Sequence, residues 1–434
     1  MPSPSPLPRV VVTGIGLLTP LGLNREDSFA RALRGEGAVT AAPADIARWL
    51  PQALSASVDP AFTARLTKNE EGLDRATQFA LVACREALQD AQRSAECGAQ
   101  AEAWPYPPER RGVFVGIGMG GATTIEALHT RFQEQVQRAA NSNGAVSPLV
   151  MHPLSVPRLM ANAAAAGISM AHQMRGPSHT YSTACASSAL ALGEALRSIR
   201  HGYADAITVV GTEAMINPGS FVAWNALRVM AKPHPSGAVA SCRPFDKDRS
   251  GFALGEGAAA LVLERADLAE LRGAKVYAEL SGYGSSSDAS HLTLSSREGQ
   301  VRAIRMALDD AGLAPTDIHY LNAHGTATQA GDLVEVEALH EVFGAHIARL
   351  PVSSTKSLHG HLSGAGGAVE LALTVLSLQR GSIPPTAYLE VPDPRCVLDH
   401  VAGVARHGQT LGAAMSNSFA FGGTNVSLVV KAHP

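Results

Sequence analysis

The chain has 434 residues, about three times the size of a typical single-domain core, so two domains or one large duplicated fold is expected. Apolar residues make up 46% of the chain and charged residues only 17%, which excludes intrinsic disorder. The chain has 35 basic and 38 acidic side chains, a net charge of −3. Proteins that bind nucleic acid or an anionic membrane typically carry an excess of basic residues, which this chain does not have. We therefore expect neither partner.

The cysteines and the N-terminus indicate a reduced, cytoplasmic protein. The five cysteines are scattered, without the CxxC spacing of zinc sites or the density of a disulfide framework: Cys84, Cys97, Cys185, Cys242 and Cys396. The N-terminus lacks the charge-first layout of a signal peptide. The longest weakly polar stretch, at 160–170, is too short to span a bilayer.

Short β-branched runs alternate with helical patterns along the first half of the chain. Strands are predicted at 9–16, 111–118 and 206–213, and helices at 75–92 and 186–200. The polar, Pro-containing stretch 91–111 is predicted to be a surface connection. This order is typical of an α/β protein with largely buried strands.

A weak internal repeat suggests a duplicated chain. The segments 251–264 and 420–431 both lead from a Gly-rich turn into an apolar strand, and KVYAELSGYG at 275–284 is similar to the opening RVVVTGIG. A boundary near residue 272 fits, with halves 1–272 and 273–434. Such simple motifs also occur by chance in α/β proteins, so both interpretations stay open at this point.

Cys185, in STACASS, has the setting of a nucleophile. It lies between an expected strand end and a helix that starts with small residues. The positive end of that helix and its unpaired N–H groups favour a thiolate over a thiol, whose usual pKa is about 8.5. The alternative is a small buried structural residue, the interpretation kept for the other four cysteines.

Two histidines lie on Gly-rich loops in the second half. His324 follows the apolar run IHYLNA, and His361 lies five residues after Lys356 in TKSLHGHLSGAGG. His359 is expected to be solvated or packed. Most histidines are structural, so only the combination of these two with Cys185 indicates a catalytic role.

One Cys and two His suit thioester chemistry, in which a thiolate takes an acyl group while imidazoles and backbone amides stabilise an oxyanion. A cysteine protease would leave the second His and the Lys unexplained. The final motif, NSFAFGGTN, is either a hinged loop that exposes N–H groups or a strand start with two core aromatics.

Taken together, these motifs resemble those of the β-ketoacyl-acyl-carrier-protein synthases. STACASS, RPFDKDRSGFALGEGA, NAHGTAT, TKSLHGH and NSFAFGGTN occur in the family's order and spacing. The resemblance implies an α/β thiolase fold, two similar halves in a five-layer α-β-α-β-α arrangement, assembled as a homodimer. The nucleophile would lie in 1–272 and both histidines in 273–434.

The resemblance also assigns roles. Cys185 would take the acyl group from its carrier, while His324 and His361 would support decarboxylation of malonyl-carrier and stabilise the enolate. Lys356 would position the histidines, with Glu370 supporting it, and the amides of Cys185 and Phe421 would form the oxyanion hole. The positions matched to substrate contacts are Thr326, Thr328, Phe419, Met119, Ser155 and Trp224, with Phe421 as the gate of the acyl pocket.

Among close relatives, the elongating type II synthases fit best. Thiolases use a second Cys near the C-terminus, which the final motif lacks. Initiating synthases pair His with Asn, and chain-length factors lack the active-site Cys. We therefore predict decarboxylative Claisen condensation of an acyl group with malonyl-carrier in fatty acid biosynthesis. No metal or redox cofactor is expected, because the substrates are carried on phosphopantetheine of acyl carrier protein.

Some positions depart from the family pattern. Lys68 and Arg228 match carrier-docking positions, but Glu70, Glu71 and Gly72 stand where basic residues are usual. Met119 and Ser155 replace the usual Ile and Phe of the acyl pocket. These departures leave two alternatives: a dedicated polyketide or polyene ketosynthase, or a non-catalytic subunit in a heterodimer with another ketosynthase.

Overall fold

The computed structural model describes residues 7–92, 104–141 and 151–433. Cys97 and most of the connection expected at 91–111 lie outside these ranges. The four cysteines within them are buried and free. No helix in the described ranges is both long and apolar enough to cross a membrane.

One eleven-stranded sheet runs through the molecule, and its strand order repeats in mirror image. In the first half the order is β5-β4-β6-β8-β1, and in the second half it is β9-β14-β13-β10-β11, followed by β12. The two halves meet where β1 pairs with β9 through Val11 and Val12. The strands are β1 (Val10–Leu18), β4 (Arg111–Gly116), β5 (Ser178–Tyr181), β6 (Ala206–Glu213), β8 (Gly257–Arg265), β9 (Ala278–Ser287), β10 (Tyr320–Asn322), β11 (Pro351–Ser353), β12 (Asp399–His400), β13 (Ala413–Phe419) and β14 (Thr424–Lys431).

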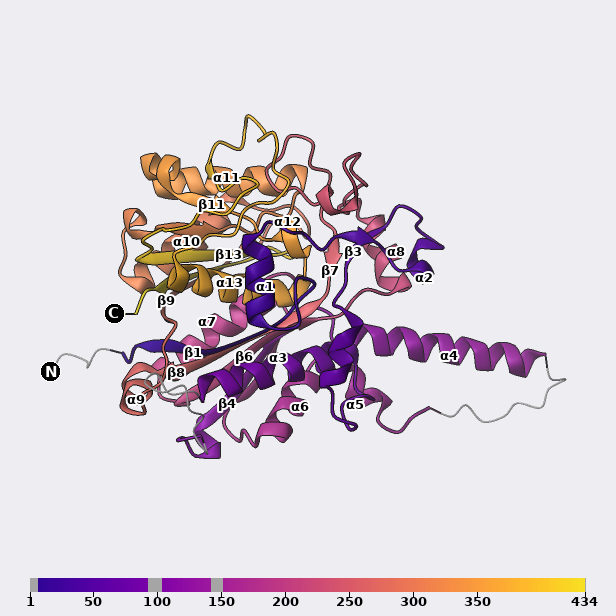
Figure 1. Cartoon of the computed structure of the whole chain (residues 1–434). Helices are drawn as coiled ribbons and strands as arrows, with labels where there is room; N and C mark the ends of the chain where they lie inside the picture. Colours follow the sequence, from indigo (N-terminus) through magenta and orange to yellow (C-terminus); the bar gives the residue numbers. More distant parts are fainter. Residues whose placement is uncertain (1–6, 93–103, 142–150, 434) are drawn as a thin grey trace.

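Helices cover and separate the two halves of the sheet (Figure 1). Helices α7 (Ser187–Arg200) and α13 (Gly366–Arg380) lie between them and contact strands of both. Helices α3 (Arg75–Ala91) and α6 (Ala163–His172) cover the first half, and α10 (Arg297–Ala311) and α11 (Gln329–Phe343) lie on the second. The result is the predicted five-layer arrangement of a duplicated fold.

The strand β1 and the strand β9 meet their helices in the same way. A Cβ on Gly14 would lie 2.2 Å from a backbone oxygen of α3, and a Cβ on Gly282 would lie 2.2 Å from a backbone oxygen of α10. The next N–H along β1 donates to Asp90 of α3, and the next one along β9 donates to Asp310 of α10. The GxG similarity between 9–16 and 275–284 therefore reflects a shared strand-to-helix contact.

The two central helices approach each other through small residues. A Cβ on Gly367 of α13 would lie 2.8 Å from Cβ of Ala189 on α7. The Ala368 N–H donates to Ser188 Oγ at 2.9 Å. Because Ser188 and Ala189 follow Cys185 closely, this contact brings the second half of the chain against the expected nucleophile.

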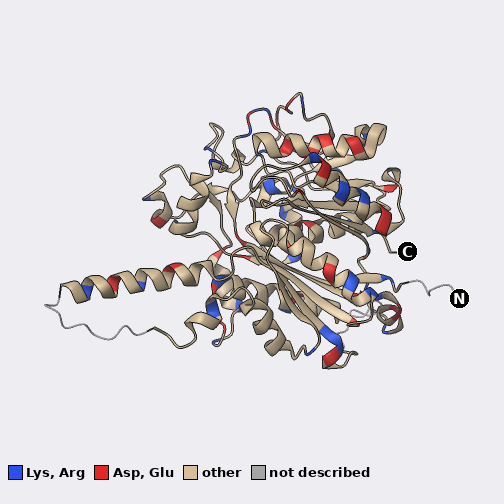
Figure 2. Ribbon diagram, turned by 180° about the vertical axis from the view of Figure 1, so that it is seen from behind, with Lys and Arg blue, Asp and Glu red and all other residues tan. Residues whose placement is uncertain are grey.

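The predicted strands and helices in the described ranges are confirmed, with ends shifted by a few residues. The expected boundary at 272 falls between α9 (Ala266–Leu271) and β9 and stays a prediction. The helix α4 (Ala122–Ala140), which projects from the body of the molecule, was not predicted (Figure 1). Its apolar residues Ile125, Phe132 and Val136 recur at helical spacing but stay exposed, and charged residues lie between them along the helix (Figure 2). The remaining elements are α1 (Arg25–Leu33), α2 (Ala44–Ala47), α5 (Ser155–Leu159), α8 (Pro218–Ala226), α12 (Lys356–His359), β2 (Thr40–Ala41), β3 (Leu54–Ala56) and β7 (Leu254–Gly255).

Candidate active site

Cys185 lies in the tight turn between β5 and α7. The preceding Ala184 has a φ of +49°, in the left-handed region, and the Thr183 N–H donates to Ser187 Oγ at 2.9 Å. The Phe421 backbone N–H donates to Cys185 Sγ. Burial nevertheless raises the pKa of the thiol to about 11. Desolvation of the thiolate thus outweighs the favourable N–H groups at the start of the helix.

His361 faces the sulfur directly, with Nε2 3.0 Å from Cys185 Sγ. The Ser363 N–H donates to His361 Nδ1 at 3.1 Å. A neutral ring that accepts at Nδ1 carries its proton on Nε2, so His361 presents an N–H to the sulfur. Burial and the nearby Lys356 ammonium lower the pKa of His361, which keeps the ring neutral.

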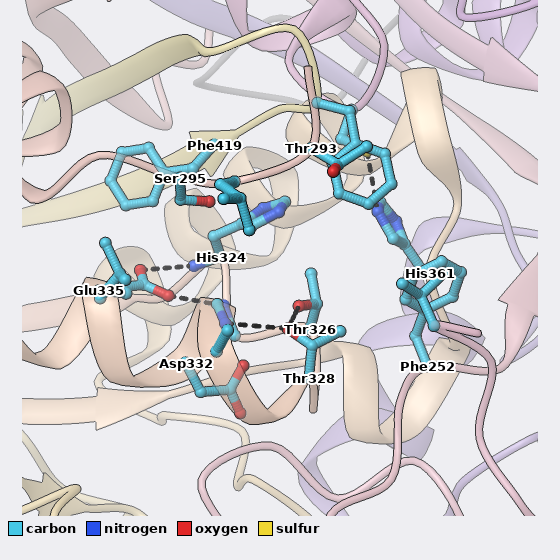
Figure 3. A pocket seen from close by; sticks show the side chains of 18 of the residues that line it. Phe252, Thr293, Ser295, His324, Thr326, Thr328, Asp332, Glu335, His361 and Phe419 are labelled. Carbon is cyan, nitrogen blue, oxygen red and sulfur yellow. Dashed lines mark hydrogen bonds between the residues drawn. The ribbon is translucent and has the colours of Figure 1, made fainter. Parts of the chain in front are cut away.

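His324 completes a pair of imidazoles, its ring centroid 5.7 Å from that of His361. The loop that carries it is held by the buried carboxylate of Glu335, which accepts the N–H groups of His324 and Gly325 at 2.8 and 2.7 Å (Figure 3). Burial, followed by the charge of Lys356, lowers the pKa of His324. Both rings are thus uncharged hydrogen-bonding groups at neutral pH.

Lys356 and Glu370 form an ion pair in which both side chains are buried. Lys356 begins α12 and Glu370 lies on α13, so the pair ties the His361 loop to the central layer. The Lys356 charge contributes to the lowered pKa of both histidines and of His359. The Lys356 charge also favours the Cys185 thiolate, although burial outweighs this effect.

Cys185, His324 and His361 line one cavity of about 450 Å³ with predominantly apolar walls. Trp224 stacks on Phe421 at 6.2 Å between ring centroids, and the Phe252 ring packs edge-on against His361 at 4.8 Å. Figure 3 shows His324 and His361 with Thr326, Thr328 and Phe419 around the same space. An acyl chain can be held there against aromatic side chains while its thioester reaches Cys185.

Two family profiles match the chain: "Beta-ketoacyl synthase, N-terminal domain" over residues 8–269 and "Beta-ketoacyl synthase, C-terminal domain" over residues 277–390. The chain belongs to the β-ketoacyl synthase family. It is 37% identical over 427 residues to the 3-oxoacyl-[acyl-carrier-protein] synthase 2 of Staphylococcus aureus (strain COL), an alignment that covers 98% of each chain.

Solved ketosynthase structures superpose on this chain over 99% of its length. The ishigamide ketosynthase/chain length factor superposes with a TM-score of 0.86 at 31% identity, covering 99% of this chain and 100% of that one. A type II PKS ketosynthase in complex with its acyl-carrier protein superposes with a TM-score of 0.85 at 27% identity, with the same coverage.

Most residues matched to the synthase motifs meet at this cavity. Those that line it are Cys185, Trp224, His324, Thr326, Thr328, His361, Phe419 and Phe421, with Lys356 and Glu370 behind. His359 is packed, as expected, between Thr355 Oγ1 and the Gly360 carbonyl.

Four of the matched residues lie away from the cavity walls. Met119 points outward with 62% of its surface exposed, and Ser155, at the start of α5, donates to the His152 carbonyl. Lys68 is exposed, and Arg228 lines a neighbouring hollow. The pocket and docking roles implied for these four residues stay predictions.

Sequence reasoning missed three groups that shape the site. Phe252 packs on His361, Glu335 anchors the His324 loop, and Glu213 accepts N–H groups from Gly118 and Gly364. Burial raises the pKa of both Glu213 and Glu335 to about 7. Glu213 and Glu335 each stand within an otherwise apolar strand or helix face. An acidic residue in such a place needs a buried hydrogen-bond partner, and this was the available signal.

Proposed function

We propose that this chain catalyses the decarboxylative Claisen condensation of fatty acid elongation. An acyl group held on Cys185 and malonyl-acyl-carrier protein give 3-oxoacyl-carrier protein and CO2. The observation that carries the proposal is the 3.0 Å contact of Cys185 Sγ with His361 Nε2 in a cavity that also holds His324. The name of the Staphylococcus aureus relative, a 3-oxoacyl-[acyl-carrier-protein] synthase, supports the same reaction.

In the first half-reaction, the Cys185 sulfur attacks the thioester carbonyl of the acyl-carrier. A new S–C bond forms, the carrier's S–C bond breaks, and the thiol proton ends on the carrier's sulfur. The N–H of Phe421, which points at Sγ, is placed to donate to the oxyanion of the tetrahedral intermediate. The His361 Nε2–H stabilises the thiolate as it forms.

In the second half-reaction, malonyl-carrier loses CO2, and the electron pair of the broken C–C bond becomes an enolate. The two neutral imidazoles donate hydrogen bonds to the enolate oxygen, which needs donors rather than a strong base. The enolate carbon attacks the acyl carbonyl, a C–C bond forms, and Cys185 leaves as the thiolate. No bound cofactor is needed, because both substrates arrive on phosphopantetheine.

One assay tests the proposal. The protein is incubated with acyl-carrier and malonyl-carrier, and CO2 release, 3-oxoacyl product and the mass of Cys185 are followed. We expect Cys185→Ala to abolish acylation and His361→Ala to impair decarboxylation while leaving some acylation. Unmodified Cys185 and no product with any carrier in a panel would contradict the enzyme and favour a non-catalytic subunit.

A polyketide or polyene ketosynthase is the second candidate. The superposition with the ishigamide ketosynthase/chain length factor favours it. The acyl panel separates the two: a fatty acid enzyme extends saturated chains of several lengths, whereas the alternative prefers unsaturated or 3-oxo chains.

We further propose that the chain works as a homodimer. The edge strand β5 pairs only with β4 among the described strands. The helix α6, which contacts β5, carries Met170 at 70% exposure, and the neighbouring α5 carries Val156 at 61% exposure, an apolar surface that favours association. Light scattering on the purified chain should give twice its mass; a monomer that pairs only with another ketosynthase would support a heterodimer.

A further inference from the structure

Glu213 is a buried carboxylate that the proposed reaction does not use. It is the last residue of β6 and is completely buried. Its hydrogen-bond donors are backbone N–H groups, and no cation pairs with it among the described residues. Burying a carboxylate without a cation costs free energy unless several N–H groups converge on it. The segments that provide those N–H groups therefore indicate what this side chain does.

One oxygen of Glu213 joins two loops. Its Oε2 accepts the Gly118 N–H at 2.7 Å and the Gly364 N–H at 3.1 Å. Its Oε1 accepts the Met119 N–H at 3.3 Å. Gly118 lies just after β4, and Gly364 lies just before α13. Two loops that are far apart in the sequence thus meet at a single side chain.

The two loops approach the carboxylate so closely that only glycine fits. A Cβ on Gly118 would lie 2.5 Å from Glu213 Oε2, and a Cβ on Gly364 would lie 2.3 Å from the Gly118 nitrogen. Glycine at both positions removes these clashes. The Gly-rich runs GIGMGG and SGAGG each contribute one glycine to this contact.

The loop after β4 continues to the nucleophile. The Gly118 carbonyl accepts the Ser182 hydroxyl at 3.0 Å, and the Ile117 N–H donates to the Tyr181 carbonyl at 3.1 Å. Ser182 follows the end of β5 and begins the turn that leads to Cys185. The position of Gly118 therefore affects the position of the sulfur.

The other loop continues to the histidine. Gly364 follows Ser363, whose N–H donates to His361 Nδ1 at 3.1 Å. Ser363 has a φ of +45°, in the left-handed region, which a residue other than glycine keeps only where its surroundings hold it. The hydrogen bond from the next residue, Gly364, to Glu213 is one of the contacts that hold it.

We propose that Glu213 is a positioning residue that sets the contact between Cys185 Sγ and His361 Nε2. Through Gly118 it holds the turn of the nucleophile, and through the backbone at Ser363 it holds the Nδ1 side of the imidazole. Without it, the Ser363 N–H moves away from Nδ1, and the ring no longer keeps its Nε2 proton aimed at the sulfur. The effect on catalysis rests on the proposed function, whereas the effect on the ring does not.

Three variants separate positioning from stability. Glu213→Leu has a similar size but accepts no hydrogen bond. Glu213→Gln keeps one oxygen, which can replace Oε2 where two N–H groups converge, so that only the longer Met119 contact faces the NH2 group. The control is Glu86→Leu. Glu86 also accepts two backbone N–H groups, from Leu17 and Arg25, but does not line the catalytic cavity.

The nitrogen NMR signals of the His361 ring report its position without any turnover. In protein with isotope-labelled histidine, the unaltered chain should show one protonated and one unprotonated ring nitrogen, assigned by their absence in His361→Ala. In Glu213→Leu the two signals should move toward each other, because a released ring interconverts between its neutral tautomers. Glu213→Gln and Glu86→Leu should keep the signals of the unaltered chain. If Glu213→Leu does not fold, Glu213→Asp, which withdraws the oxygens by one methylene, carries the same expectation.

CO2 release at saturating malonyl-carrier is the second measurement. Glu213→Leu should lower this rate on the order of a hundredfold, the effect of a misplacement of about 1 Å, while Glu213→Gln and Glu86→Leu stay close to the unaltered rate. Unchanged ring signals in Glu213→Leu would overturn the proposal, as would an equal change in either of the other two variants. If the unaltered chain releases no CO2, the proposed function falls, but the ring signals still decide whether Glu213 positions His361.

Discussion

His361 Nε2 lies 3.0 Å from Cys185 Sγ, and the opposite nitrogen of the ring accepts a backbone N–H. The imidazole is therefore arranged to donate to sulfur rather than to remove its proton. This differs from a cysteine protease, where an imidazolium and a thiolate form an ion pair.

The first prediction concerns the pH dependence of Cys185 alkylation. Burial raises the pKa of this thiol to about 11, so the thiolate fraction increases about tenfold per pH unit below that value. The rate of modification by iodoacetamide, followed by intact mass, should rise from pH 6 to pH 10 without a plateau. A plateau that begins between pH 6 and pH 8 would instead indicate a thiolate–imidazolium pair. Cys185→Ala identifies the modified residue.

The second prediction concerns the buried ion pair behind the histidines. Removing one partner leaves an uncompensated buried charge, so Lys356→Met or Glu370→Leu should each lower the free energy of unfolding by about 3 kcal/mol or more. The double variant should lose less than either single variant, because no charge is left unpaired. Urea titration measures all three. Additive losses would show that the two side chains do not stabilise each other.

The third prediction separates acylation from decarboxylation. In Glu335→Gln, one of the two N–H groups at the His324 loop faces an amide NH2 instead of a carboxylate oxygen. Loss of a charged hydrogen bond corresponds to about tenfold or more in rate. We expect that decrease in CO2 release, with little change in Cys185 acylation. Glu337→Gln, on the exposed face of the same helix, is the matched control. Equal decreases in CO2 release and in Cys185 acylation would instead mean that Glu335 only stabilises the loop.

The fourth prediction tests the contact between β9 and α10. A Cβ on Gly284 would lie 2.0 Å from the Ala303 carbonyl oxygen, a distance that requires the strand and helix to separate. Gly284→Ala should lower the free energy of unfolding by about 3 kcal/mol. Gly219→Ala, whose Cβ would meet nothing closer than 3.4 Å, should change it by less than about 1 kcal/mol. A thermal melt of each variant is sufficient.

The sequence predicted the strands, the repeat and the cavity's chemical residues because each left a local signature. Cys185 stood before small residues that start a helix, and His324 followed an apolar run. Phe252 and Glu335 had no such signature, since their roles come from long-range contacts with the histidine loops. The outward position of Met119 was also beyond sequence reasoning, because a pocket position in the family motif does not fix where a side chain points in an isolated chain.

The close contact between α7 and α13 restricts which substitutions these two helices can accept during evolution. Ser188 and Ala189 face Gly367 and Ala368, and a larger side chain on either helix would push α7, which begins just after the nucleophile, away from α13. A substitution here survives only when a smaller residue compensates on the opposite helix. Paired substitutions across this contact are therefore expected among related sequences.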